Sequence, residues 1–94
     1  MNYRVVYLDT ALNDMSEIKD YLEQHSITAW SKLIDIMERK LKNLEQFPNI
    51  GERHKNYRRL VCGDYLVFYQ VNEEYKTILV ARILHGRLDI RSLL

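Results

Sequence analysis

The segment YRRLVCGDYLVFYQV, residues 57–71, decides the fold of this chain. Apolar and aromatic residues stand on both sides of a Cys-Gly-Asp step, and such residues favour strands. Gly63 accepts the backbone conformation of a tight turn, so the segment predicts a hairpin of strands 57–61 and 65–71. Further on, TILVARIL at 77–84 predicts a third strand, and its small polar face indicates a central place in the sheet.

Upstream of the hairpin, the apolar period changes to that of helices. YRVVYL at 3–8 predicts a short strand, and Asp9 or Thr10 is expected to cap the helix that follows. A second amphipathic helix is expected over residues 30–44, joined to the first by a short turn. The order β-α-α-β-β-β predicts an α+β fold: one domain over residues 1–94, with a small, mainly antiparallel sheet and an N-terminal helical hairpin on one face.

Composition limits the classes of protein that the chain can represent. It has 94 residues, a net charge of +1 and a single cysteine, so no disulfide forms within it. We find no signal peptide and no apolar run of membrane-spanning length, and we expect a cytoplasmic protein with no membrane contact. Residues 1–50 carry six Lys/Arg and eight Asp/Glu, whereas residues 51–94 carry eight and five, so the positive surplus lies in the second half.

Histidine and arginine residues gather where the last predicted strand ends, in ILHGRLDIR at 83–91. Extending the alternation of residues 79, 81 and 83 places His85 and Arg87 on one face and Arg82 on the other. Arg58 and Arg59 point to opposite faces, so only one of them joins His85. The candidate set is His85 as catalytic residue, with Lys55, Arg58, Arg59, Arg87 and Arg91 as ligands of a phosphate or of another target.

This basic set has two interpretations. In the first, a histidine transfers protons and arginines hold a phosphate, which suffices to cleave RNA without metal. In the second, the arginines are solvated or pair with Glu52 and Asp89, and spacing alone favours this second interpretation. The histidines lack metal-ligand spacing and the glycines are isolated, so we expect no metal and no cofactor.

Three stretches together resemble the RelE/ParE superfamily of bacterial toxins from type II toxin–antitoxin modules: LEQFPNIGER, RRLVCGDYLVFYQV and VARILHGRLD. The resemblance covers nearly the whole chain. It implies a compact sheet with two N-terminal helices, and a cognate antitoxin whose acidic, amphipathic C-terminal segment wraps the toxin. It also implies that operator DNA is bound only through the antitoxin, and that growth stops when the antitoxin is degraded.

The superfamily divides by target, and this sequence is similar to both branches. Members similar to RelE and YoeB cleave mRNA on the ribosome, and His85, Arg87 and one of Arg58 or Arg59 match basic positions of that branch. Tyr65, however, stands where that branch usually has an arginine, its late tyrosine is absent, and LHGRLD is closer to ParE. The sequence therefore slightly favours a ParE-like inhibitor of DNA gyrase. The alternative is a metal-independent, ribosome-dependent mRNA endoribonuclease with His85 in proton transfer.

Overall fold

A computed structural model describes residues 2–88 and confirms the α+β fold, with one strand more than predicted. The additional strand, β2, has only three residues, Glu-Arg-His, and these show no apolar alternation from which a strand could be recognised. The elements are β1 (Arg4–Tyr7), α1 (Asp9–His25), α2 (Ala29–Leu44), β2 (Glu52–His54), β3 (Tyr57–Cys62), β4 (Tyr65–Asn72) and β5 (Thr77–His85).

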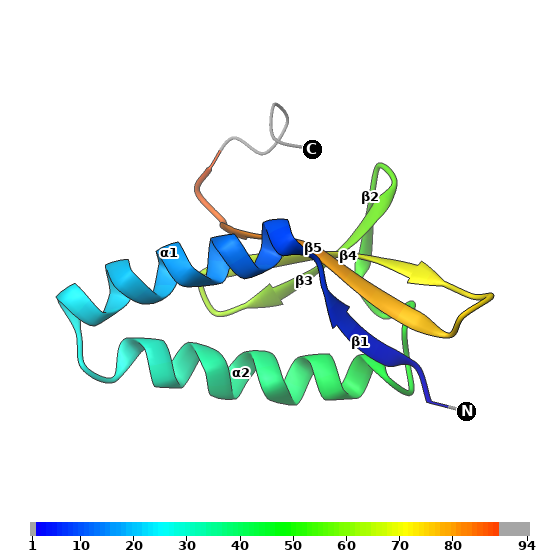
Figure 1. The fold of residues 1–94 in the computed structure, drawn as a ribbon, viewed down its shortest axis with the longest axis horizontal. Helices are drawn as coiled ribbons and strands as arrows, with labels where there is room; N and C mark the ends of the chain where they lie inside the picture. The colour runs from blue at the N-terminus through cyan, green and yellow to red at the C-terminus, as the bar shows by residue number, and fades with distance from the viewer. Residues whose placement is uncertain (1, 89–94) are drawn as a thin grey trace.

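The five strands form one sheet in the order β1-β5-β4-β3-β2. The predicted hairpin of β3 and β4 is confirmed, with Gly63 in the left-handed region at φ +60°. Every pair is antiparallel except β1 with β5, so the mainly antiparallel sheet is confirmed as well. Figure 1 shows α2 below the sheet and the β2 turn rising on the opposite side.

Helix α2 supplies the helical half of the core. Its buried residues Leu33, Met37, Leu41 and Leu44 recur at steps of four, four and three, which aligns them on one face of the helix. They pack with fully buried residues of the two central strands, among them Val67, Tyr69, Ile78 and Val80. This stripe therefore packs the helix against the sheet.

Helix α1 lies along the outer edge of β5 rather than deep in the core. Its two buried residues are Ala11 and Asp14. Strand β1 pairs with β5 only over Thr77–Val80, so the rest of that edge needs other hydrogen-bond partners. The Thr10 hydroxyl donates to the Ala81 carbonyl at 2.6 Å. The predicted cap by Asp9 or Thr10 is therefore wrong, because the N-cap residue is Leu8, which precedes both and makes no side-chain cap bond.

A β-bulge interrupts the alternation of β5. Val80 lies opposite Tyr69, but two residues later Arg82 lies opposite Phe68, the neighbour of Tyr69. At this point β5 thus has one residue more than β4. Side chains of β5 beyond the bulge therefore point to the face opposite the one that simple alternation predicts. The predicted alternation through residues 79, 81, 83 and 85 is wrong for this reason. His85 lies on the face that the helices cover, and Arg82 lies on the other.

The face away from the helices is partly closed by β2. Phe68 on that face is fully buried, and the His54 ring from β2 packs edge-on against it at 5.6 Å between ring centroids. Arg59 and Arg82 lie beside Phe68 on the neighbouring strands. Neither helix within residues 2–88 has the length and apolar character needed to cross a membrane.

Candidate functional site

His85 ends β5 and its ring is held on two sides. It lies opposite Tyr65, with ring centroids 5.2 Å apart at an interplanar angle of 81°. Its Nδ1 accepts a hydrogen bond from the backbone N–H of Arg87 at 3.1 Å. An imidazole nitrogen that accepts carries no proton, so the neutral ring in this arrangement bears its proton on Nε2. The turn is fixed further because Gly86 donates its N–H to the Asp64 carbonyl at 2.8 Å.

A groove of about 750 Å³ adjoins His85 and runs between α1 and the end of β5. Its apolar lining includes Ile18, Leu84 and Leu88, and its carboxylates come from Asp14, Glu17 and Asp64. Within residues 2–88, the Lys or Arg side chain that lines the groove is that of Arg82. Among the described residues, the lining of this groove is therefore mainly acidic and apolar, which is the reverse of a phosphate-binding site.

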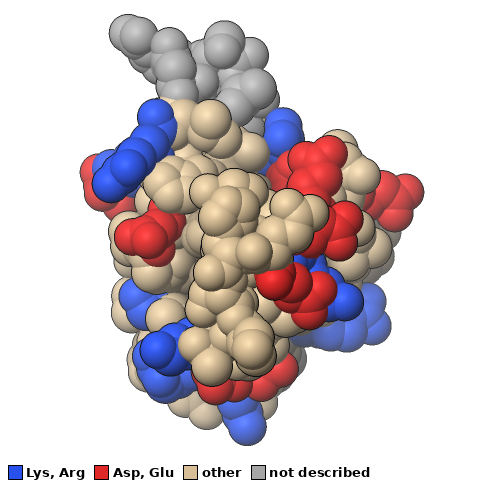
Figure 2. All heavy atoms as spheres, turned by 90° about the vertical axis from the view of Figure 1, so that its left-hand side faces the viewer, with Lys and Arg blue, Asp and Glu red and all other residues tan. Residues whose placement is uncertain are grey.

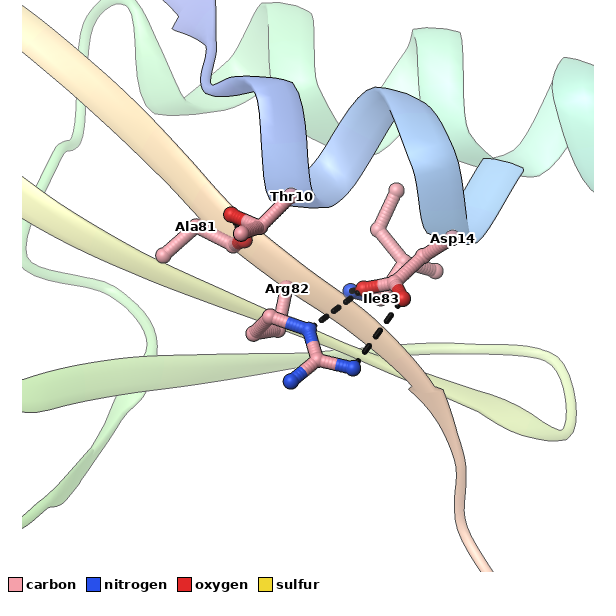
Figure 3. Close-up of polar contacts among 5 residues, drawn as sticks. All are labelled: Thr10, Asp14, Ala81, Arg82 and Ile83. Atoms are coloured by element: carbon pink, nitrogen blue, oxygen red, sulfur yellow. Dashed lines mark hydrogen bonds and ion pairs between the residues drawn. The ribbon is translucent and has the colours of Figure 1, made fainter. Parts of the chain in front are cut away.

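The charge of Arg82 is already neutralised by Asp14 (Figure 3). The guanidinium donates from Nε at 2.7 Å and from Nη2 at 3.1 Å, and the hydrogen bonds to Asp14 are the main cause that raises the pKa of Arg82. The same carboxylate accepts the backbone N–H of Ile83 at 2.9 Å. Asp14 thereby joins α1 to the part of the β5 edge that does not pair with β1. The signal in the sequence was an acid within the apolar stripe of α1, next to Met15.

Arg58 and Arg59 lie away from His85 and have partners of their own. Arg58 lies opposite Tyr69, four residues along β4 from the partner of His85, which corresponds to roughly 13 Å along the strand. Its Nη1 donates to the carbonyls of Asn49 and Gly51 at 3.1 and 2.9 Å. Arg59 lies on the other face and pairs with Glu52 at 3.1 Å, as the second interpretation predicted.

The remaining predicted residues occupy turns or lie outside the described part of the chain. Lys55 is in the β2–β3 turn with φ 55°, and Arg87 is in the turn after β5. Arg91 and Asp89 lie outside residues 2–88. The structure thus brings Arg87 to His85 through a backbone contact, but within residues 2–88 it does not bring the other predicted basic residues to His85. Residues 2–88 also contain no group of three or more metal-ligating side chains.

The end of the molecule that carries the α1–α2 connection has an uncharged centre. Figure 2 views this end and shows an uncharged strip, with acidic side chains gathered on its right and basic ones at lower left. Two apolar residues are strongly exposed in this region, Tyr21 at 57% and Ile27 at 94%. Tyr21 also lines the groove beside His85. Exposed apolar area next to a groove is typical of a surface that binds another protein.

Comparison with solved structures identifies the fold. The chain of the RelBE2 toxin–antitoxin complex from Mycobacterium tuberculosis has a TM-score of 0.66 at 20% identity, with 90% of this chain and 99% of that chain covered. A chromosomal ParDE system from P. aeruginosa gives 0.69 at 20% identity, covering 88% and 95%. The intact E. coli RelBE complex gives 0.63 at 17% identity, covering 92% and 99%. The fold is that of the RelE/ParE toxin superfamily.

The family itself follows from the sequence. Residues 2–90 match the family model for the ParE toxin of the type II toxin-antitoxin system, parDE. A search of curated proteins found no match. Since the family model spans nearly the whole chain, the chain belongs to the ParE toxin family.

Proposed function

We propose that this toxin arrests growth by binding DNA gyrase and does not cleave mRNA. The main support for this proposal is the environment of His85, where acidic and apolar residues line the groove and Arg82 is paired with Asp14. Cleavage of RNA builds negative charge on the phosphate and requires cations at the reacting group. Here the carboxylates of Glu17 and Asp64 would repel the phosphate. A groove with an apolar floor beside an exposed tyrosine instead favours contact with a protein.

The test is a supercoiling assay with purified toxin, gyrase and relaxed plasmid, in the absence of ribosomes. Inhibition is expected at micromolar toxin. Tyr21→Ala should weaken it about tenfold, because an exposed aromatic side chain at a groove is typical of an interface anchor. Tyr75→Ala is the matched control, since Tyr75 is 71% exposed and does not line this groove. Absence of inhibition by the wild-type toxin would refute the proposal.

The nuclease alternative is tested with His85→Gln, which keeps a polar side chain but removes proton transfer near neutral pH. Gyrase inhibition and growth arrest are expected to persist in this variant. Cleavage of mRNA in the ribosomal A site by the wild type, lost together with growth arrest in His85→Gln, would establish the alternative instead.

For the antitoxin, we propose a docking surface on the groove between α2 and β3, which has a volume of about 600 Å³. Arg39, Lys40 and Lys42 line it together with Ile50 and Leu60. An acidic, amphipathic segment of the kind expected for the antitoxin matches both the cations and the apolar floor. The basic residues here belong to α2, in the half of the chain whose net charge is negative.

This surface predicts a salt-dependent affinity for the cognate antitoxin. Arg39→Glu should weaken binding about tenfold and flatten its dependence on salt, because a rim charge is lost and reversed. Lys19→Glu is the control, since Lys19 is exposed on α1 outside the groove. Equal losses in both variants would show that overall charge, and not this groove, governs binding.

A further inference from the structure

Two arginines face one another across the β2–β3 pair. Arg53 and Arg58 are direct partners in the antiparallel register, so their side chains leave the same face of the sheet. Like charges in such positions have Cβ atoms roughly 4.5–5.5 Å apart and destabilise the pair of strands. This pair of arginines lies far along the sheet from His85, so the site at His85 does not account for it.

Neither arginine has its positive charge compensated by a carboxylate within residues 2–88. The Arg53 side chain makes no hydrogen bond or ion pair with any residue of that range. The hydrogen bonds of Arg58 to Asn49 and Gly51 are made by Nη1 to neutral carbonyls. Those two bonds fix the guanidinium plane and leave its other nitrogens without a partner among the described residues. The guanidinium of Arg58 is thus held in place before a ligand binds, and the side chain of Arg53 can move toward the ligand.

Both arginines line a polar pocket of about 510 Å³, a volume within the range of small-molecule sites. Side-chain amides of Asn56 and Gln70 line the same pocket, and they supply further donors and acceptors. Glu73 also lines it, but its carboxylate pairs with Lys76 at 3.6 Å and accepts the Tyr3 hydroxyl at 2.5 Å. The uncompensated charge of the pocket is therefore positive.

We propose that this pocket binds the phosphoryl group of a small molecule, between the guanidinium groups of Arg53 and Arg58. Planar guanidinium forks match phosphate oxygens with paired, charge-assisted hydrogen bonds. A bound dianion would also reduce the repulsion between the two arginines. Asn56, in the turn between the two strands, belongs to the same lining and would contact the rest of the ligand, as for a nucleoside phosphate. The site is independent of gyrase binding and does not involve His85.

The test is calorimetric titration of the purified toxin with ADP, inorganic pyrophosphate and citrate at low ionic strength. ADP and pyrophosphate are expected to bind and to raise the Tm, and citrate, whose carboxylates are differently spaced, to bind at least tenfold more weakly. Arg53→Gln should reduce the affinity for pyrophosphate at least tenfold, while Arg53→Lys retains part of it. Arg53 is exposed and its side chain makes no hydrogen bond or ion pair within the described chain, so this variant is expected to fold.

Arg39→Gln is the matched control, because it removes the same charge from an exposed position on α2 outside the pocket. Retained pyrophosphate binding in Arg39→Gln, with loss in Arg53→Gln, supports the site. No binding of pyrophosphate or ADP at millimolar concentration overturns the proposal. Equal losses in the two variants, or citrate binding as tightly as pyrophosphate, would also overturn it, because either result indicates a non-selective attraction of anions.

Discussion

Replacing Asp14 by alanine is expected to destabilise the toxin more than any exposed substitution on α1. The Asp14 side chain is 9% exposed and accepts three hydrogen bonds, two from Arg82 and one from the backbone of Ile83. Alanine leaves the guanidinium unpaired and the Ile83 N–H without its acceptor. The strand edge that Asp14 covers then has no replacement partner in β1, which ends at Tyr7.

The magnitude follows from these contacts. Removal of one partner from a buried ion pair costs about 3–5 kcal/mol. The Arg82 side chain is 27% exposed, so water compensates it in part and about 2 kcal/mol is appropriate. An unsatisfied buried backbone donor adds about 1 kcal/mol. The free energy of unfolding should therefore fall by about 3 kcal/mol, which for a domain of this size lowers Tm by roughly 12–24 °C.

Urea and thermal unfolding followed by circular dichroism measure the effect. Asp20→Ala provides the control, because Asp20 is exposed on the same helix, and its free energy of unfolding should change by no more than about 0.5 kcal/mol. The single variant Arg82→Ala and the double variant with Asp14→Ala complete a double-mutant cycle. This cycle should reveal a coupling of about 1–2 kcal/mol between Asp14 and Arg82. The reasoning fails if Asp14→Ala costs less than about 1 kcal/mol or behaves like Asp20→Ala.

Four further outcomes are expected. Tyr69→Phe should lower the free energy of unfolding by about 1–2 kcal/mol in urea titrations, since the buried hydroxyl donates to the Pro48 carbonyl at 2.8 Å and accepts the Gly51 N–H at 2.9 Å. Burial raises the pKa of the Tyr69 hydroxyl. The contribution of this hydroxyl to stability is therefore complete below about pH 10 and is lost as pH rises through its folded-state pKa. Between about pH 9 and 11 the wild type should lose more stability than Tyr69→Phe, and equal losses would contradict this. Gly51→Ala should unfold at a lower temperature in calorimetry, because an added Cβ would lie 2.8 Å from the Arg59 carbonyl oxygen; an unchanged Tm would show that the loop gives way freely. Cys62 should react with a thiol reagent only as fast as the protein opens, because the side chain is fully buried and burial raises its pKa; rapid labelling of the native toxin would contradict this.

Much of the fold was predictable because its signals are local. The hairpin around Gly63 and the stripe of α2 depend on residues close in the chain, and both are confirmed. Strand β2 carries no such signal, since its three polar residues form a strand only because β3 offers them an edge. The bulge in β5 also depends on the partner strand, and missing it placed Leu79 on the same face as His85, although the opposite placement of His85 and Arg82 was predicted correctly.

The candidate site was predicted less well for a related reason. Charge and strand ends identified His85 and the arginines, but which charges are already paired is a property of the packed structure. Arg82 is paired with an acid 68 residues away, on another element, and no local pattern connects the two. Arg53 and Arg58 become cross-strand partners only once β2 exists.

The pairing of β1 with β5 has a consequence for synthesis. Residues 4–7 find their strand partner only in residues 77–80, and α1 is fastened to β5 just beyond them. While the chain is being translated, β1 and α1 emerge long before the strand that they need. Contacts of such long sequence separation form late in folding. A nascent chain that has not released β5 from the ribosome therefore lacks the finished groove beside His85.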